Sequence, residues 1–340
     1  MAFSLSIIIP CYNIADNIPK TLDSLSRLRN AENCEFIFVN DGSTDDTLSY
    51  IQNFAKNDLR AIVINQSNQG VSAARNAALK IATKEYLLCL DGDDYLAPNT
   101  IQIIQQNIQK ADALLTPCIV KTIKAEQINT LGIPNGVYSI DQVYKKCRVF
   151  PTAPMIVYRN SIVQRKHLTF NTTIKSGEVY DFTVSFFEYA HTIAINNIGF
   201  YYYVMRGSSA THRPNYEADL SVLKIANHFD KISHYWRHST SFLLTELKMI
   251  TSFTYNKYVR NGLTNEDTLN TLQVVFSNQH FQKLLSSIIT RSVGFKYKLW
   301  VIYLKYMPLK IGYLICTHVY QANKYIKDLL FSKKTSNFAN

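Results

Sequence analysis

Short apolar runs alternate with amphipathic stretches along the first part of the chain. The apolar runs have the length and composition of buried strands and cover residues 5–9, 36–39, 61–64 and 86–90. Between them, apolar residues recur at helical spacing in residues 16–28, 43–55 and 70–82. This strand–helix alternation predicts an α/β fold, in which a mostly parallel, doubly wound sheet is flanked by helices.

The pattern becomes less regular after this part. A turn of the hairpin type is expected at residues 133–138, where Pro134 and Gly136 interrupt the alternation. Beyond it, apolar spacing predicts a helix at residues 178–190. Further strands are predicted at residues 155–158, 193–198 and 201–205.

A last change in pattern predicts a domain boundary near Arg213 and Pro214. From Tyr216 onward the apolar spacing is helical. We therefore expect an α/β domain over residues 1–213, an all-helical C-terminal region over residues 214–331 and a loose tail over residues 332–340.

The charge of the chain is unevenly distributed. Its 340 residues carry a net charge of +11, yet residues up to Asp112 contain 13 acidic and 9 basic side chains. The remainder contains 12 acidic and 27 basic side chains, so we expect the two parts to face different partners. Nucleic acid is not expected to be one of them, because the first part is acidic and no nucleic-acid-binding motif is present.

The spacing of the cysteines and the length of the apolar runs indicate the cellular compartment of the protein. The six cysteines are scattered without a C-x-x-C pair, which is typical of reduced core residues in a cytoplasmic protein. No signal peptide is expected, because no basic segment precedes the first strand. The longest strictly apolar run, residues 299–304, is far shorter than a membrane span. We therefore expect a soluble or peripheral protein.

Three carboxylates gather directly after the strand at residues 86–90. The segment reads Asp91-Gly92-Asp93-Asp94, and like charges at such short spacing repel one another. A divalent cation removes that cost, since Mg²⁺ binds one or two protein carboxylates while substrate phosphate oxygens help to complete its shell. An Asp-Gly turn followed by a helix N-cap is the alternative interpretation.

Polar clusters also follow two other strands, at residues 10–13 and 40–45. The carboxyl ends of parallel strands share one edge of a sheet, where such α/β proteins bind their ligands. Each cluster alone is compatible with ordinary loop and capping chemistry. Three clusters that converge on one edge favour a nucleotide site.

Four sequence blocks resemble those of bacterial family 2 glycosyltransferases, which have the Rossmann-like GT-A fold. The blocks follow the order typical of that family and read SIIIPCYN at residues 6–13, VNDGSTD at 39–45, NQGVSAARN at 68–76 and LDGDD at 90–94. A weaker similarity extends to about residue 213. The helical C-terminal part shows no such resemblance.

The resemblance implies a UDP-sugar as donor and a divalent cation, Mg²⁺ or Mn²⁺, as cofactor. In similar proteins the residues around Pro10, together with Asp41, hold the uracil. Asp91 would then contact the ribose, and Asp93 would hold the cation against the diphosphate. The residues implied for the donor are Pro10, Tyr12, Asn13, Asp41, Asn68, Arg75, Asp91, Gly92 and Arg206, and those implied for the cation are Asp91, Asp93 and His212.

Two of these residues have plainer interpretations. Arg75 opens a predicted helix, and a solvated helical arginine is an equally good account of it. His212 lies in a predicted loop, where histidines are more often surface residues than metal ligands.

The expected catalytic base departs from the family pattern. Similar proteins carry Glu-Asp at the start of a helix, but here Glu178 is followed by Val179, which cannot accept a proton. Asp181 lies three residues after Glu178 on the same helical face. We expect Asp181 to act as the base and Glu178 to orient the acceptor. Alternatively, both carboxylates merely complement the N-terminus of the helix.

The C-terminal segment at residues 291–334 combines basic and aromatic side chains, with Asp328 as its one acid. Lysine together with tyrosine and tryptophan suits an anionic membrane surface. A helical bundle that packs its aromatic residues inward and leaves its lysines in water is the alternative.

Together, these features and the resemblance predict a metal-dependent hexosyl- or N-acetylhexosaminyltransferase, and the resemblance implies inversion at the anomeric carbon. It would move a sugar from a UDP-sugar to a hydroxyl of a glycan or lipid-linked acceptor, at the cytoplasmic face of the inner membrane, in lipopolysaccharide or capsule synthesis. A sugar-nucleotide nucleotidyltransferase would need a Gly-rich loop with Arg and Lys after the first strand, and residues 10–16 contain none of these. A non-catalytic partner that binds nucleotide-sugar or glycan stays open, because Val179 replaces an acid.

Overall fold

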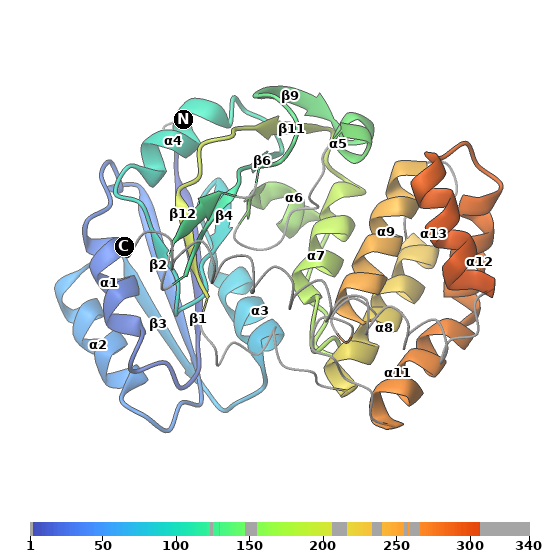
Figure 1. Ribbon diagram of the computed structural model, residues 1–340. Helices are drawn as coiled ribbons and strands as arrows, with labels where there is room; N and C mark the ends of the chain where they lie inside the picture. Colours follow the sequence, from blue (N-terminus) through green and yellow to red (C-terminus); the bar gives the residue numbers. More distant parts are fainter. Residues whose placement is uncertain are drawn as a thin grey trace, which may run out of the picture. The chain divides into compact units, whose positions relative to one another are not determined.

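The structure is a computed structural model that describes residues 3–122, 125–128, 130–146, 155–205, 216–232, 240–254, 258 and 266–306. The chain forms two compact units (Figure 1). The first contains residues 1–173 and 177–209, and the second contains residues 174–176 and 210–340. The boundary predicted near Arg213 lies outside the described residues, so the division at residue 213 and the tail at 332–340 stay predictions.

The first unit is built on an eight-stranded sheet with the order β3-β2-β1-β4-β10-β6-β11-β9. The strands β3, β2, β1 and β4 are parallel, whereas β10 is antiparallel to both of its neighbours and β9 is antiparallel to β11. This arrangement confirms the predicted α/β fold with a mostly parallel sheet. The strand bounds are β1 (Leu5–Cys11), β2 (Cys34–Asp41), β3 (Ala61–Gln66), β4 (Tyr86–Cys89), β6 (Ala113–Leu115), β9 (Gly136–Ser139), β10 (Ile156–Arg159) and β11 (Thr192–Ile195).

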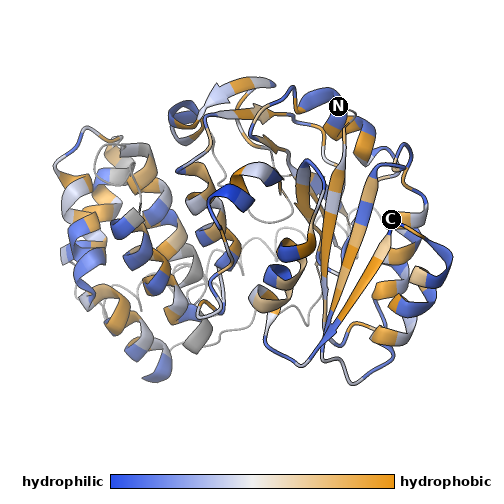
Figure 2. Ribbon diagram, turned by 180° about the vertical axis from the view of Figure 1, so that it is seen from behind, coloured by the Kyte–Doolittle hydropathy of each residue, from blue (hydrophilic) through white to orange (hydrophobic). Residues whose placement is uncertain are grey.

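The central strands are buried on both faces, which explains their continuous apolar runs. Ile7, Ile8 and Ile9 of β1 and Phe36 and Phe38 of β2 are fully buried. Figure 2 shows strands of this sheet in the colour of hydrophobic residues. The four strands predicted before residue 91 are therefore confirmed.

Helices cover both sides of the sheet, with α1 and α2 on one side and α3 and α6 on the other (Figure 1). The helix α3 packs closely because Ala74 and Ala78, which are fully buried, present almost no side chain to the strands. The helix bounds in this unit are α1 (Ile18–Ser26), α2 (Thr47–Asn57), α3 (Val71–Ile81), α4 (Thr100–Asn107), α5 (Ile140–Lys146), α6 (Asn160–Arg165) and α7 (Glu178–Phe187).

A second, four-stranded sheet has the order β5-β12-β7-β8. Its strands are β5 (Tyr95–Leu96), β12 (Tyr201–Val204), β7 (Cys118–Lys121) and β8 (Glu126–Ile128). The turn predicted at residues 133–138 extends into β9, and β8 and β9 join different sheets. The hairpin interpretation of residues 133–138 is therefore wrong, because β9 pairs with β11, a strand distant in sequence.

The described part of the second unit is helical, as predicted. Its helices are α8 (Tyr216–Ile232), α9 (Thr240–Phe253), α11 (Glu266–Ser277), α12 (Gln279–Ile289) and α13 (Phe295–Tyr306). The side chain of Asn278 caps α12 by accepting a hydrogen bond from the Phe281 backbone N–H at 3.1 Å. No described helix combines the length and apolar character that crossing a membrane requires.

Candidate functional site

The carboxyl ends of β1, β2 and β4 meet at one edge of the main sheet, because these strands are parallel neighbours. The strand order turns back between β1 and β4, since β2 and β3 extend the sheet on the other side of β1. In open α/β sheets such a reversal opens the crevice in which ligands bind. The three polar clusters predicted from the sequence are brought together there.

The loop after β1 is tied to the loop after β2 by hydrogen bonds. The side-chain oxygen of Asn13 accepts a hydrogen bond from the Thr44 backbone N–H at 2.8 Å, and the Asn13 N–H donates to Ser43 Oγ at 3.0 Å. The Ile14 N–H donates to Thr47 Oγ1 at 2.9 Å. Asn13 has a φ of 48°, a left-handed conformation that asparagine tolerates better than most residues. Asn13 therefore fixes the loop that presents the neighbouring Tyr12, which is 49% exposed.

Asp41, at the end of β2, is almost fully buried. One of its carboxylate oxygens accepts hydrogen bonds from Gln66 Nε2 at 2.7 Å and from the Gln69 N–H at 2.9 Å. The other oxygen accepts from the Gly70 N–H at 2.8 Å. A carboxylate has about four acceptor positions, so roughly one is left for a further N–H.

The segment around Asn68 approaches the end of β2 closely. A Cβ on Gly42 would lie 2.6 Å from the Asn68 backbone nitrogen, and Gly42 has a φ of +73°. Glycine is therefore required at residue 42 for both space and backbone conformation. Asn68 itself is exposed beside this loop.

The segment Asp91–Asp94 after β4, here called the acidic loop, lies against the end of β1 because its second residue is Gly92. A Cβ at this position would be 2.5 Å from Ile14 Cδ1 and 3.0 Å from the Pro10 carbonyl oxygen. The hydroxyl of Thr21 in α1 donates to the carbonyl oxygens of Gly92 at 2.9 Å and Asp94 at 2.6 Å. A glycine is therefore needed between Asp91 and Asp93, because only a residue without a side chain lets the loop pack this closely against β1.

Asp94 has a structural partner in the second sheet. The Tyr201 hydroxyl donates to Asp94 Oδ2 at 2.9 Å and accepts from the Asp91 N–H at 3.0 Å. The other oxygen of Asp94 accepts from the Val204 N–H at 2.9 Å. Burial and the charge of Asp91 raise the pKa of Asp94 to about 8. Tyr201 therefore anchors the acidic loop, a role that the sequence did not reveal.

Arg75 joins two of the predicted site residues. Its guanidinium forms ion pairs with Asp91 Oδ1 at 2.9 Å and with Glu178 Oε1 at 2.7 Å. The Arg75 side chain is 3% exposed, so the alternative of a solvated helical arginine is wrong. Burial disfavours its charge, but the two carboxylates outweigh burial and hold the pKa of Arg75 above its ordinary value. The end of β4 and the start of α7 are thus linked through α3.

The helix α7 begins at Glu178, after Gly177 with a φ of 84°. Phe182 stacks on Phe170, with ring centroids 4.1 Å apart, and Phe170 is held by two backbone hydrogen bonds to the Asn76 side chain, each 2.8 Å long. Asp181 is only 1% exposed, whereas the Glu178 side chain is 14% exposed. Glu178 is connected to the acidic loop through Arg75.

Asp91 and Asp93 carry carboxylates, the ligand type that Mg²⁺ accepts beside phosphate oxygens. Both side chains are half-buried. The pKa of the Cys11 thiol, at the end of β1, is raised mainly by the burial of Cys11 and further by the negative charges of Asp93 and Asp91. No group of three or more His, Cys, Asp or Glu side chains is placed to hold a metal within the part of the chain that the structure describes. Arg206 and His212 lie outside the described residues, so their roles stay predictions.

The chain is similar to known glycosyltransferases. Residues 6–169 match the family model described as glycosyl transferase family 2. Poly(ribitol-phosphate) beta-glucosyltransferase of Bacillus spizizenii is 31% identical over 210 residues, which cover 59% of this chain and 32% of that protein. The uncharacterized glycosyltransferase EpsJ of Bacillus subtilis is 28% identical over 221 residues, covering 62% of this chain and 63% of EpsJ. The chain therefore spans about a third of the first relative and less than two thirds of the second.

A solved structure supports the fold. The crystal structure of S. aureus TarS 1–349 in complex with UDP-GlcNAc has a TM-score of 0.73 and 20% sequence identity. The similarity covers 94% of this chain and 92% of that one. The predicted GT-A fold and the predicted resemblance to family 2 glycosyltransferases are confirmed.

The anchoring role of Tyr201 can be tested by its change to phenylalanine. Tyr201→Phe removes the donor to Asp94 and the acceptor of the Asp91 N–H, so we expect the free energy of unfolding to fall by about 1–3 kcal/mol. Urea denaturation measures this change. Tyr202→Phe is the matched control, because the Tyr202 ring stacks on Tyr95 at a centroid distance of 4.5 Å and keeps that stack. Equal stability of both variants would contradict the anchoring role.

Proposed function

Residues 6–169 match the model of glycosyl transferase family 2, and we propose that this protein transfers a sugar from a UDP-sugar to a hydroxyl of a glycan or lipid-linked acceptor. One observation carries the proposal: the carboxylates of Asp41, Asp91 and Asp93 lie at the carboxyl ends of β2 and β4, the two parallel neighbours of β1, at the edge where the sheet order reverses. The similar TarS fold was solved with UDP-GlcNAc, which supports this class of donor.

The donor is proposed to lie with its uracil near β2 and its diphosphate near β4. Asp41 has an acceptor position left for the uracil N–H, and Pro10, Tyr12 and Asn13 form the adjoining loop. Arg75 pairs with Oδ1 of Asp91. We propose that the other carboxylate oxygen of Asp91 contacts the ribose or the cation. The diphosphate then lies beside Asp93.

We propose that Asp93, together with Asp91, holds Mg²⁺ or Mn²⁺ against the diphosphate. The bound cation would act as a Lewis acid and offset the negative charge that the UDP leaving group develops. Within the protein, the ion pair with Arg75 reduces the repulsion between Asp91 and its acidic neighbours. The acidic loop therefore keeps its conformation before the donor arrives.

Glu178 is proposed to be the base that takes the proton from the acceptor hydroxyl. A base must approach this hydroxyl to hydrogen-bond distance, and the Glu178 carboxylate is more accessible than that of the nearly buried Asp181. Arg75 binds one oxygen of Glu178 and thereby orients the other. This assignment reverses the roles expected from the sequence, where Asp181 was the base and Glu178 oriented the acceptor.

The sugar is proposed to be a hexose or N-acetylhexosamine and the acceptor a bacterial surface polysaccharide. Lipopolysaccharide and capsule are the acceptors expected from the sequence. The relatives that act on poly(ribitol phosphate) add a phosphate-containing polymer to this group. Transfer with inversion is the stereochemistry that the family resemblance implies.

The helix α13 supports peripheral contact with an anionic membrane at the cytoplasmic face. Phe295, Leu299, Ile302 and Tyr306 are 75%, 51%, 39% and 67% exposed and recur every three or four residues, so they share one face. The opposite face packs inward through Val301 and Leu304. The buried face of α13 is aliphatic and the aromatic residues Phe295 and Tyr306 are exposed, which favours the membrane interpretation over inward-packed aromatic residues for this helix.

Asp93→Asn tests the donor and cation site. We expect UDP with Mn²⁺ to raise the thermal midpoint of the wild-type protein, because a ligand that binds only the native state stabilises it. The variant should lose most of this shift. Asp46→Asn, at an exposed residue directly before α2, is the control and should keep it. An equal shift in all three proteins would refute the site.

Glu178→Gln tests the base. Turnover with a panel of UDP-sugars and glycan acceptors should fall by about 10²–10⁴-fold while the UDP-induced thermal shift is retained. Asp181→Asn is the comparison and should retain most of the activity if the variant folds. Loss of activity in Asp181→Asn alone would assign the base to Asp181. Donor binding without turnover in the wild-type protein would favour the non-catalytic binding partner.

A paired substitution on α13 tests membrane contact. Leu299→Gln with Ile302→Gln removes two exposed apolar side chains, so we expect weaker co-sedimentation with phosphatidylglycerol vesicles. Val274→Gln on α11 is the control, since Val274 is similarly exposed, at 41%, in the same unit. Unchanged sedimentation of the α13 variant would contradict this role.

A further inference from the structure

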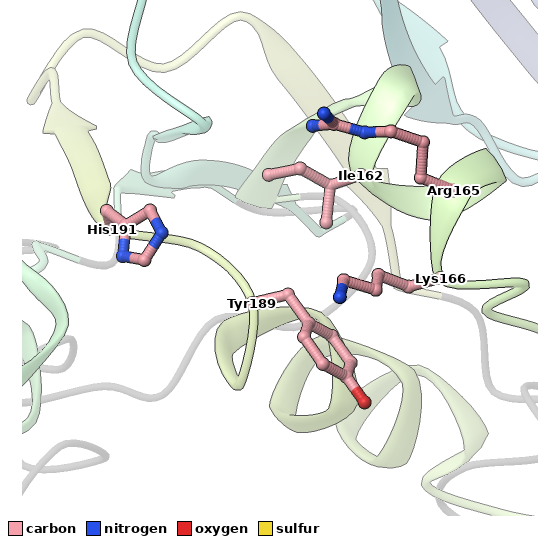
Figure 3. Close-up of a pocket in the computed structure, with 5 residues that line it drawn as sticks. All are labelled: Ile162, Arg165, Lys166, Tyr189 and His191. Carbon is pink, nitrogen blue, oxygen red and sulfur yellow. The ribbon is translucent and has the colours of Figure 1, made fainter.

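The first unit contains a cavity that the proposed transfer reaction does not use. It has a volume of about 260 Å³ and is lined by Ile162, Arg165, Lys166, Tyr189 and His191 (Figure 3). Arg165 ends α6 and Lys166 follows it, whereas Tyr189 and His191 belong to the connection between α7 and β11. We call it the basic cavity.

The basic cavity lies at the edge of the sheet opposite the acidic loop. The antiparallel pairing of β10 with β4 places Arg159 beside Tyr86, the first residue of β4. The helix α6 starts directly after Arg159. Thr192, which begins β11 next to His191, is at the same edge, because Ile193 pairs with Ala113 at the start of β6. The acidic loop instead follows the last residue of β4.

The positive side chains of the basic cavity have no acidic partner in the described part of the chain. Arg165 uses its Nε to donate to the Ser161 carbonyl oxygen at 3.0 Å, which leaves the terminal nitrogens of its guanidinium available. Lys166 Nζ lies 4.7 Å from the centroid of the Tyr189 ring. In Figure 3 the Arg165, Lys166, Tyr189 and His191 side chains surround one shared space.

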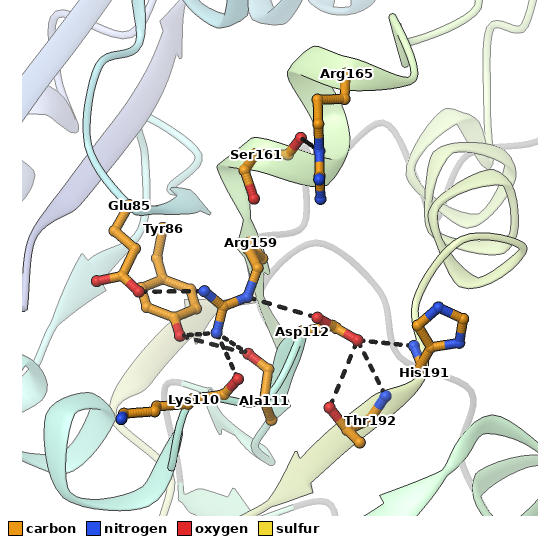
Figure 4. Close-up of polar contacts among 10 residues, drawn as sticks. All are labelled: Glu85, Tyr86, Lys110, Ala111, Asp112, Arg159, Ser161, Arg165, His191 and Thr192. Carbon is orange, nitrogen blue, oxygen red and sulfur yellow. Dashed lines mark hydrogen bonds and ion pairs between the residues drawn. The ribbon is translucent and has the colours of Figure 1, made fainter.

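The neighbouring carboxylate of Asp112 is already neutralised. One of its oxygens lies 3.5 Å from Arg159 Nε. The other accepts hydrogen bonds from the backbone N–H groups of His191 at 2.7 Å and Thr192 at 3.1 Å (Figure 4). Glu188, adjacent to Tyr189 in the sequence, does not line the cavity. The charges of Arg165 and Lys166 are therefore not cancelled from within the cavity.

We propose that the basic cavity binds the phosphate group of a phosphate ester. Arginine offers two parallel N–H donors to a phosphate, and lysine adds a compact positive charge. The His191 ring supplies a further hydrogen-bonding group, while the Tyr189 ring and the buried Ile162 form an apolar wall. The volume is below the roughly 300–1,000 Å³ of sites for drug-sized ligands, so it suits one phosphate-bearing group.

Titration with inorganic phosphate at constant ionic strength, followed by calorimetry, tests this proposal. Arg165→Gln combined with Lys166→Gln should weaken binding by about tenfold or more. The control pair Lys56→Gln and Lys80→Gln removes the same charge from exposed residues of α2 and α3. It should change the affinity by less than about twofold. Equal affinity of the two pairs would overturn the proposal.

Two further arms complete the experiment. The exchange Arg165→Lys with Lys166→Arg keeps both charges and should retain binding, and an unchanged thermal midpoint of the Gln pair excludes misfolding as the cause of a loss. Vesicles of phosphatidylglycerol distinguish the source of the phosphate: weaker vesicle binding by the Gln pair assigns a lipid headgroup, and unchanged vesicle binding assigns a soluble phosphate ester. The cavity proposal is independent of the proposed transfer, because Asp93→Asn should leave the contribution of Arg165 and Lys166 to phosphate binding intact.

Discussion

The buried guanidinium of Arg75 is the interaction on which the candidate site depends. A buried charge needs partners, and removing one of them leaves the other without compensation. Arg75 satisfies this requirement with Asp91 on one side and Glu178 on the other. The same ion pairs bring a carboxylate after β4 next to a carboxylate at the start of α7, from parts of the chain that are 87 residues apart in the numbering.

Near Arg75, the acidic loop is held mainly by contacts that leave the carboxylates of Asp91 and Asp93 accessible. Thr21 binds its backbone, Gly92 allows it to approach β1, and Tyr201 binds Asp94. Asp94 is therefore a structural residue of the loop, whereas Asp91 and Asp93 are half-buried. Such preorganisation lowers the cost of binding a polyanionic donor together with a cation.

The sequence predicted those features that local pattern determines. The strands before residue 91 are continuous apolar runs, and the polar clusters that end them had to meet at one edge once the strands were parallel. Contacts between distant segments left no such signal. Arg75 and Glu178 are 103 residues apart, and Tyr201 and Asp94 are 107 apart, so neither pair is visible as spacing. The strands β5, β6 and β8 were missed because two or three residues are too few for a periodic pattern.

The most direct test of this account is a crystal structure of the protein with UDP and Mn²⁺. We predict that the uracil lies beside Asp41, that Mn²⁺ bridges Asp93 and the diphosphate, and that Arg75 still contacts Asp91 and Glu178. A nucleotide bound away from the carboxyl ends of β1, β2 and β4, or a cation held by residues other than Asp91 and Asp93, would contradict it.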